Sequence, residues 1–538
     1  MSRTPLTLMG PSRRAPLDVQ GLRVHCRQRV AAGEAAETVD LLLDLVEALA
    51  ARVEHLEQRI ARMAQAQWGQ KSERLTSAQL CLALGDAPPL AALPPAGEAD
   101  TPAQGEGESD EPAPTPRPTR KKTRQIPAHI PRTTILSEPP EDQRICHDCG
   151  THKHCIGSES SEVLEWEPGG FRVEVTERRK YACRRCGCGV VMGPGPSRVL
   201  PQAMPGAGLL AEVVVRKIKD SCPLDRQSRI FSERFGVPLS PSTLGEWLAG
   251  TADVLAPLSR RLREQGLQSP HLSFDDTPIR VLDPTHEKGV KRGHLWSFVS
   301  DAPLVFYEYT PSWSGAPIQS LLSDYSGTLQ SDGYSGINAL YKKESAPTRA
   351  GCLAHARRKF HNAYQTGDLR AAGPLRLIQQ LYAIEKRAKQ DGCDATERLQ
   401  RRRAESQPLM QSLHEELQRL GAQAPPKTPL GQAITYALRQ WPTLIVFVRD
   451  GAQRIDNNHT ERTLRPVAIG RKNWLFAGSD DGARRLAILY TLIGSCEQAG
   501  LRDPWHYLRD VLRKLSQDWP YSRIDELLPR AWQATQSP

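Results

Sequence analysis

Residues 271–282, HLSFDDTPIRVL, decide how the largest part of this chain is expected to fold. Two further apolar segments follow, GHLWSFVSD (293–301) and LVFYEYTP (304–311), both rich in β-branched and aromatic residues. Such short runs predict neighbouring strands. A helix-like segment, PIQSLLSDY (317–325), and a fourth strand, GTLQSDGYSG (327–336), come next. This order predicts a mixed α/β sheet with antiparallel hairpins at one side.

Two aspartates occupy equivalent places on this sheet. Asp275 follows the inward-facing residues Leu272 and Phe274 of the first strand, and Asp332 ends the fourth strand just before Gly333. Because an unpaired buried carboxylate is costly, these positions are poor choices for packing and suit a metal ion. Each aspartate has an alternative role as the cap of a turn.

A third acid lies in the stretch RIDNNHTERTLRPVAIGRKNWLFAG (454–478). Residues 456–458 are good helix caps, which predicts a helix with Glu461 on its first turn, facing the strands if the helix packs on the sheet. Alternatively, Asn458 and Glu461 have the spacing of a capping box. Cations and an aromatic ring gather in the same stretch and predict contacts with phosphates and bases. The DNA contacts assigned here are Arg462, Arg465, Arg471, Lys472 and Trp474.

Two CxxC pairs, CHDCG and CRRCG, predict a structural zinc site between residues 136 and 200. Four thiolates can occupy the corners of a tetrahedron, and the intervening FRVEVTERRKY predicts hairpin strands of a zinc ribbon. The alternatives are exchange of one ligand with Cys188 or a nearby histidine, and a redox CxxC, against which the duplication argues. The assigned ligands are Cys146, Cys149, Cys183 and Cys186.

Residues 204–255 have helical patterns and resemble a helix-turn-helix. Gly236 is expected to end one helix, while Ser240 as N-cap and Pro241 at the first position start the next. Ser242 and Thr243 on that second short helix are candidate groove contacts. An ordinary helical hairpin explains the pattern nearly as well.

The amino-terminal part predicts a coiled coil over residues 37–82. Between residues 39 and 63, valine or isoleucine recurs at every a position and leucine or methionine at every d position, which favours a parallel two-stranded coiled coil and a homodimer. The alternative is one amphipathic helix packed on a neighbouring domain. Residues 1–36 stay unassigned, and residues 83–135 form a Pro-rich linker, with nine prolines between 86 and 118.

Composition narrows the class of partner. The 538 residues include 71 Lys and Arg against 61 Asp and Glu, and the net charge of +10 favours a polyanion such as nucleic acid. No window approaches 18 uncharged apolar residues, so no membrane partner is expected. The first residues contain no apolar run long enough for a secretory signal, which predicts a cytoplasmic protein.

Several motifs together carry a resemblance to a known family. The chain resembles the insertion-sequence-66 family of bacterial transposases from about residue 37 to its carboxyl end. It departs from the family pattern at Asp276, where Glu usually follows the first acid, and at Trp68, where Phe is typical. The motifs are WGQKSERL (68–75), the paired CxxC, SFDDTPIRVL, LQSDGYSGIN, GCLAHARRKF (351–360), DNNHTERTLRP and GRKNWLFAGS.

The resemblance implies a multidomain α+β protein in which a leucine zipper, zinc ribbon and helix-turn-helix precede an RNase H-like DDE catalytic domain over 266–490. Asp275, Asp332 and Glu461 would be its three acids. An all-helical insertion is expected at about 366–448 and a helical carboxyl-terminal segment over 491–538. His355, in the GCLAHARRKF motif, either approaches a phosphate or a metal ligand, or is simply packed.

The implied activity is DNA transposition with catalytic Mg2+ or Mn2+ bound by the three acids, since carboxylates are the oxygen ligands that such ions prefer. The enzyme would cleave element ends and transfer the freed 3′ hydroxyl into target DNA. The expected partners are DNA, a second copy of the chain and accessory proteins of the same element, with nucleoid association through DNA. Two rival functions are a dimeric DNA-binding regulator without catalysis and an RNase H-like nuclease without strand transfer.

Overall fold

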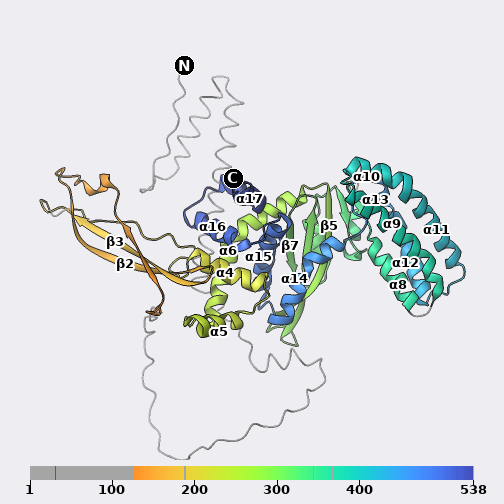
Figure 1. Ribbon diagram of the computed structural model, residues 1–538, viewed down its shortest axis with the longest axis horizontal. Coiled ribbons are helices and arrows are strands. Elements are labelled where there is room, and N and C mark those ends of the chain that lie inside the picture. Colours follow the sequence, from red (N-terminus) through yellow and green to blue (C-terminus); the bar gives the residue numbers. More distant parts are fainter. Residues whose placement is uncertain are drawn as a thin grey trace, which may run out of the picture. The chain divides into compact units, whose positions relative to one another are not determined.

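The computed structural model describes residues 126–186, 189–342, 345–365 and 368–536, together with the single positions 29 and 31 (Figure 1). The predicted coiled coil, residues 1–36 apart from those two positions, and the linker up to residue 125 lie outside this range. The coiled coil and the homodimer therefore stay predictions.

The first described domain is a four-stranded sheet around a long hairpin. Strand β3 (Gly170–Ala182) pairs antiparallel with β2 (His154–Glu167) and with the short β4 (Val191–Met192), and parallel with β1 (Arg132–Ser137). A single turn, η1 (Glu141–Arg144), follows β1. The hairpin occupies the chain between the two CxxC pairs, as the alternating pattern predicted.

Three helices lead to the central sheet: α4 (Ala207–Ile218), α5 (Leu224–Phe235) and α6 (Pro241–Leu267). Gly236 ends α5 at φ +63°, and the Ser240 hydroxyl accepts a hydrogen bond from the backbone of Thr243 at the start of α6, as predicted. The expectation of a short second helix is wrong. Helix α6 continues past the predicted boundary at residue 255, because its apolar stripe goes on through Leu258 and Leu262, which are buried.

The central sheet has the strand order β7-β6-β5-β8-β9. Strands β5 (His271–Leu282), β6 (Val290–Ser300) and β7 (Val305–Thr310) are antiparallel neighbours, whereas β8 (Thr328–Gln330) and β9 (Thr348–Ala350) continue the sheet parallel to β5. The predicted mixed sheet is thus confirmed, with β9 as an addition. Helix α7 (Ala316–Leu321) precedes β8, and η2 (Ser335–Lys342) follows it.

Helices cover both faces of this sheet. Gly494 of α15 (Asp480–Gln498) lies against Val305, and Gly266 of α6 lies against Phe306, each so closely that a β-carbon would collide. Because successive strand residues point to opposite faces, α15 and α6 pack on opposite sides. Helix α14 (Asn458–Trp474) lies on the α15 side, where Thr463 bonds Ser297 and accepts from Tyr307.

Between β9 and α14 every described element is helical. The helices share a hydrophobic core of their own, separate from that of the sheet, and this core begins with α8, before the predicted insertion boundary at residue 366. The elements are α8 (Leu353–Gln365), η3 (Leu369–Ala371), α9 (Ala372–Gln390), α10 (Ala395–Arg401), the π-helical η4 (Arg402–Ser406), α11 (Gln407–Gly421), α12 (Pro429–Leu444) and α13 (Val446–Arg449).

The carboxyl-terminal segment packs on the first helices of the sheet domain. It comprises α16 (Pro504–Ser516), η5 (Tyr521–Leu527) and α17 (Pro529–Gln536). The indole of Trp505 donates to the Gly208 carbonyl in α4 at 3.0 Å, and Arg513 lies 3.6 Å from the Glu165 carboxylate in β2. In the part of the chain that the structure describes, no helix is long and apolar enough to cross a membrane.

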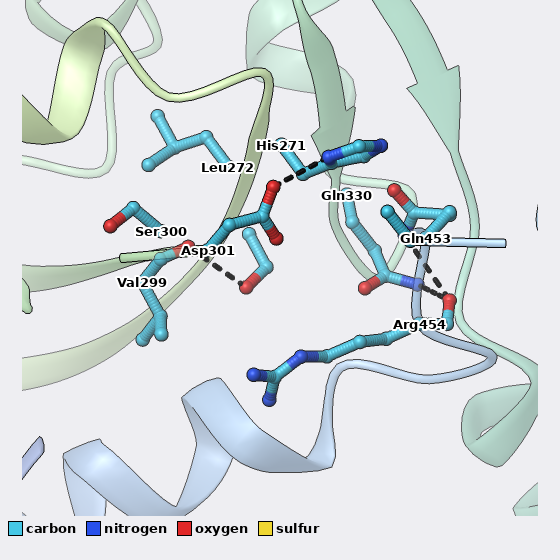
Figure 2. Close-up of a pocket in the computed structure, with 10 residues that line it drawn as sticks. His271, Leu272, Val299, Ser300, Asp301, Gln330, Gln453 and Arg454 are labelled. Carbon is cyan, nitrogen blue, oxygen red and sulfur yellow. Dashed lines mark hydrogen bonds and ion pairs between the residues drawn. The ribbon is translucent and has the colours of Figure 1, made fainter. Parts of the chain in front are cut away.

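A histidine at the start of β5 joins the sheet to the helical insertion. The His271 Nδ1 lies 2.6 Å from Asp301 Oδ2, and its Nε2 lies 2.6 Å from Asp450 Oδ2, just after α13. Figure 2 shows His271 and Asp301 at a small cleft that Gln330 and Arg454 also line. The hydrogen bond to Asp301, reinforced by Asp450 against the effect of burial, raises the pKa of His271 to about 9.

This histidine should make stability depend on pH. Because the pKa of His271 is higher in the folded protein than the usual value of about 6.5, its stabilisation is complete below about pH 6.5 and is lost as the pH rises through about 9. We expect the wild-type excess in free energy of unfolding over a His271→Gln variant to shrink across that window, as measured by urea denaturation. His361→Gln, which alters an exposed histidine of α8, is the control. A constant excess would contradict the prediction.

Candidate active site and zinc centre

The four predicted cysteines converge at one end of the β2–β3 hairpin. The Sγ atoms of Cys146 and Cys186 lie 3.5 Å apart, as do those of Cys149 and Cys183, and Cys149 and Cys186 are separated by 3.7 Å. Tetrahedral zinc with Zn–S bonds of about 2.3 Å requires sulfur atoms about 3.8 Å apart, so the spacing fits zinc. Hydrogen bonds from Thr151 lower the pKa of Cys149 to about 7, which favours the thiolate.

Cys155, a nearby cysteine that could compete as a zinc ligand, is not part of this cluster. Cys155 is exposed in β2, and its thiol contacts the Gly157 carbonyl. Cys188 lies outside the described residues. Within the described part of the chain, the four cysteines are the one group of three or more His, Cys, Asp or Glu residues whose ligand atoms all lie within 4.8 Å of one another.

Buried hydrogen bonds hold the first turns of α14 against β5 and β6. The Asn457 side chain is 1% exposed and donates to the Phe274 carbonyl at 2.9 Å. The Thr460 hydroxyl donates to Ser273 Oγ at 2.8 Å, and one turn further on Thr463 bonds Ser297 of β6 at 2.6 Å. We call this set of contacts the α14 seam. It brings Glu461 to the strand that carries Asp275.

The Asp275 carboxylate is largely buried and close to other acids. Its Oδ1 accepts the backbone N–H of Asp276 at 2.9 Å. Burial raises the pKa of Asp275 to about 7, and the negative charges of Asp332, Asp276 and Glu461 add to that shift. Asp332 and Glu461 are therefore near enough to Asp275 to repel its charge, although they come from other elements of the fold.

Asp332 lies in the turn after β8. Its Oδ1 accepts the backbone N–H of Tyr334 at 3.2 Å, and its carbonyl accepts a hydrogen bond from Tyr436 of α12 at 3.1 Å. The alternative role of Asp332, as the cap of a turn, is thus observed for one of its two carboxylate oxygens, Oδ1. The hydrogen bond from Tyr436 also joins the turn that contains Asp332 to the helical insertion.

Glu461 faces helix α8 and is not part of a capping box. Helix α14 begins at Asn458 with no side-chain cap, and the Glu461 N–H bonds the Asn457 carbonyl. Its carboxylate lies 3.4 Å from the Arg358 guanidinium and 3.8 Å from His355 Nε2. Burial lowers the pKa of His355, which outweighs the opposite effect of Asp332 and Glu461.

The three carboxylates are spaced more widely than the cysteines. They do not meet the 4.8 Å criterion that the cysteine group satisfies among the described residues. As a donor set, three carboxylates are of the hard oxygen type that divalent cations such as Mg2+ prefer.

Sequence reasoning missed an aromatic cluster beside the acids. Asp276 accepts hydrogen bonds from the Trp313 indole at 3.2 Å and pairs with His294 Nδ1 at 2.5 Å. The Tyr334 hydroxyl donates to the Trp313 carbonyl at 2.8 Å, and the Trp313 side chain is 58% exposed. Arg358 was also missed, although it lies in the GCLAHARRKF motif. Its position, about one helical turn after His355, was the feature of the sequence that could have identified it.

The predicted DNA contacts on α14 divide into two groups. Arg462, Arg465 and Lys472 are exposed, as a DNA contact requires. Arg471 instead donates to Thr277 Oγ1 at 2.7 Å and to the Pro278 carbonyl at 2.6 Å. Trp474 is buried, with Lys217 over its ring at 5.2 Å, so its burial argues against the predicted stacking on a base.

The two candidate groove contacts on α6 also differ. Ser242 is half-buried, whereas Thr243 is buried and its hydroxyl bonds Ser240 Oγ at 2.8 Å. Thr243 therefore completes the helix cap and offers no surface to a DNA groove.

The sequence of residues 202–485, which contain the sheet and all three acids, matches the family model described as transposase IS66 family. The match covers more than half of the chain. The chain belongs to the IS66 transposase family. Three further models match its other parts: the zinc-finger binding domain of transposase IS66 at 143–187, the transposase C of IS166 homeodomain at 55–135, and the IS66 C-terminal element at 491–530.

Relatives of similar length support the assignment to the IS66 family. The uncharacterized protein y4jD of Sinorhizobium fredii is 34% identical over 512 residues, which is 91% of this chain and 97% of the relative. The uncharacterized protein y4qI of the same organism is 34% identical over 418 residues, 75% of this chain and 76% of that protein.

Removing one zinc ligand should release the metal from this IS66 transposase. We expect Cys183→Ser to lower bound zinc from about one ion per chain to near zero and to unfold the hairpin domain, because the metal-binding energy is folding energy there. Elemental analysis and hydrogen exchange of residues 132–192 measure both effects. Cys155→Ser is the matched control. Retention of zinc by Cys183→Ser would refute the assignment of these four ligands.

Removing one bond of the α14 seam should weaken the site without unfolding the chain. Thr460→Val keeps the shape of the side chain and deletes its hydrogen bond to Ser273, so we expect a loss of about 1 kcal/mol in free energy of unfolding. Metal-dependent DNA cleavage should fall more than this small change in stability explains. Thr396→Val, at an exposed position of α10, is the control. Equal cleavage by both variants would contradict a positioning role for the seam.

Proposed function

We propose that this chain is a DDE transposase that cuts DNA at the ends of its element and joins the freed 3′ hydroxyl to target DNA. The observation that supports this best is the electrostatic coupling of Asp275 to Asp332 and Glu461. These acids come from a strand, a strand end and a helix, and 129 positions separate the last two. Structural carboxylates rarely gather without cations to neutralise them.

The strand order supports an RNase H-like interpretation of the catalytic domain. Three antiparallel strands are followed across the sheet by two that run parallel to the first, with helices on both faces. Asp275 lies on the central strand, and Asp332 lies just beyond its parallel neighbour. Both side chains therefore approach the same part of the sheet, which is what a shared cation site requires.

Asp275, Asp332 and Glu461 would hold Mg2+ or Mn2+. When bound, these cations supply activation of the attacking hydroxyl and stabilisation of charge on the attacking and leaving oxygens. The carboxylates of this chain supply hard oxygen ligands. Burial, and then repulsion by the neighbouring acids, raises the pKa of Asp275, and positive charge between the acids would relieve that repulsion.

Two side chains of α8 complete the proposed site. Burial lowers the pKa of His355, so its imidazole is neutral at neutral pH and can accept or donate a single hydrogen bond. Arg358 keeps its positive charge beside Glu461 and is well placed to orient a phosphate. The exposed Arg462 and Arg465 extend this positive surface along α14.

The proposed reaction has two steps. Water attacks a phosphodiester at the element end and releases a 3′ hydroxyl. That hydroxyl then attacks a phosphodiester of target DNA, so one ester bond forms as another breaks and no nucleoside triphosphate is consumed. The heptad pattern of residues 39–63 supports a homodimer, which fits the need to hold two element ends together.

Replacing Asp332 by asparagine tests the catalytic assignment. We expect Asp332→Asn to lose cleavage of element-end DNA by at least about 100-fold in the presence of Mg2+, because a charged metal ligand becomes neutral. Binding of the same DNA, measured by gel shift, should persist. Asp324→Asn, which removes an exposed carboxylate between α7 and β8, is the matched control. Undiminished cleavage by Asp332→Asn would remove the catalytic assignment and favour a DNA-binding regulator.

The fate of the cut ends separates transposition from simple hydrolysis. The wild-type reaction should convert cleaved donor ends into products joined to a second, labelled DNA. If cleavage occurs and no joined product forms with either metal, the chain is an RNase H-like nuclease instead.

A further inference from the structure

A basic groove lies at the far end of the β5–β6 hairpin, beside the last turn of α14. Its volume is about 820 Å3. Six of the residues that line it are lysine or arginine, and among its described lining residues none is acidic. These cations are Arg280, Lys288, Lys291, Arg292, Arg471 and Lys472.

Most of the positive charge in this groove is not neutralised by acids. Lys291 does pair with acids, with Asp283 at 3.0 Å and with Asp480 at 2.7 Å. Lys288, Arg292 and Lys472 are exposed, and in the part of the chain described by the structure no ion pair joins them to a carboxylate.

Arg471 contributes a cation whose hydrogen-bond acceptors are neutral. It donates to a hydroxyl and a carbonyl of β5. Burial and then the charge of Arg292 lower the pKa of Arg471, so the two guanidinium groups repel each other across the groove. An anion between them would remove this repulsion.

The lining suits a polyanion better than a small apolar ligand. Pockets for small molecules are mostly apolar with a few polar groups, whereas this groove has cations from two strands, their connecting turn and a helix end. Cations spread along an open groove match the regular charges of a nucleic-acid backbone.

The distance from the acids to the groove follows from the lengths of two elements, α14 and β5. Along α14, eleven residues from Glu461 to Lys472 span about 16 Å at 1.5 Å per residue. Along β5, five residues from Asp275 to Arg280 span about 17 Å. Both distances correspond to about five base pairs of duplex at 3.4 Å each.

One exposed face of α14 connects the two places. Arg462, Arg465, Ile469 and Lys472 are all exposed and follow one another at intervals of three, four and three positions, which places them on one side of the helix. A duplex lying along this face meets positive charge from the acids to the groove.

We propose that this groove binds the phosphate backbone of duplex DNA about five base pairs from the phosphate that the acids cleave. The inference rests on the proposed function for the position of the cleaved phosphate. It adds Arg280, Lys288 and Arg292 of the hairpin to the DNA-binding surface.

The first test measures how salt weakens binding to a random-sequence duplex. A full-length triple variant, Lys288→Gln, Arg292→Gln and Lys472→Gln, should bind at least about 10-fold more weakly at low salt. The slope of log affinity against log salt should fall by about 2–3, close to 0.9 per lost contact. The control is Lys386→Gln, Lys389→Gln and Arg403→Gln, which removes the same charge from exposed positions of the helical insertion.

Any of three results would overturn the proposal. An unchanged slope in the groove variant would show that these side chains contact no phosphates. An equal loss in the control would show an effect of net charge alone. If inorganic phosphate or a mononucleotide competes as strongly per phosphate as duplex DNA does, the groove is a small-anion site instead.

A second test locates the contact relative to the cut. Element-end duplexes are shortened one base pair at a time on each side of the cleavage position, and their affinities are compared. When fewer than about five base pairs remain on one side of the cleavage position, the affinity of the wild-type protein should drop. The groove variant should not show this drop in affinity. Absence of the drop in the wild type would refute the location.

The two proposals fail separately in these experiments. Asp332→Asn should keep the full salt slope while losing cleavage. If Asp332→Asn still cleaves, the catalytic assignment fails although the groove result stands. If the groove variant keeps the wild-type slope while Asp332→Asn is inactive, the groove inference alone fails.

Discussion

The α14 seam is the constraint on which the candidate site depends. Asp275 and Asp332 approach each other through strand pairing, but Glu461 belongs to a helix that follows a long helical insertion. The bonds of Asn457 to the Phe274 carbonyl and of Thr460 to Ser273 hold that helix on the central strand. Because these groups are buried, a shift of the helix would leave polar atoms without partners, so the seam fixes the position of the helix far better than apolar contacts would.

The packing of α14 on the sheet also encloses the carboxylate of Asp275. A carboxylate enclosed by a sheet and a helix loses hydration, and burial accordingly raises the pKa of Asp275. A cation, Arg358, lies next to Glu461, whereas no ion pair joins Asp275 to a cation among the residues that the structure describes. The folded state thus holds an acid whose charge is stabilised by one backbone hydrogen bond, from Asp276, and is opposed by burial and by neighbouring acids.

Local pattern predicted the strands and the cysteine cluster, since each depends on residues close in sequence. Strand β9 escaped prediction because three residues, Thr348–Ala350, are too short to show a period. The length of α6 and the burial of Trp474 and Thr243 depend on partners far along the chain, which a local pattern does not specify. Glu461 was ambiguous for the same reason. Only the contacts with His355 and Arg358 distinguish an acid that faces α8 from one that caps its own helix.

Two physical explanations account for the cations in the last turn of α14. The cations of the β5–β6 hairpin distinguish between these explanations. Cations in the last turn of a helix offset its dipole, so Arg471 and Lys472 could serve the helix alone. Lys288 and Arg292 come from a strand connection and a strand, where no helix dipole acts on their own backbone. Arg292 repels Arg471 of α14, and Lys288 lines the same groove. Such repulsion is retained in a fold when a bound anion relieves it, and a rigid helix that begins at the acids fixes where along a DNA backbone that anion must lie.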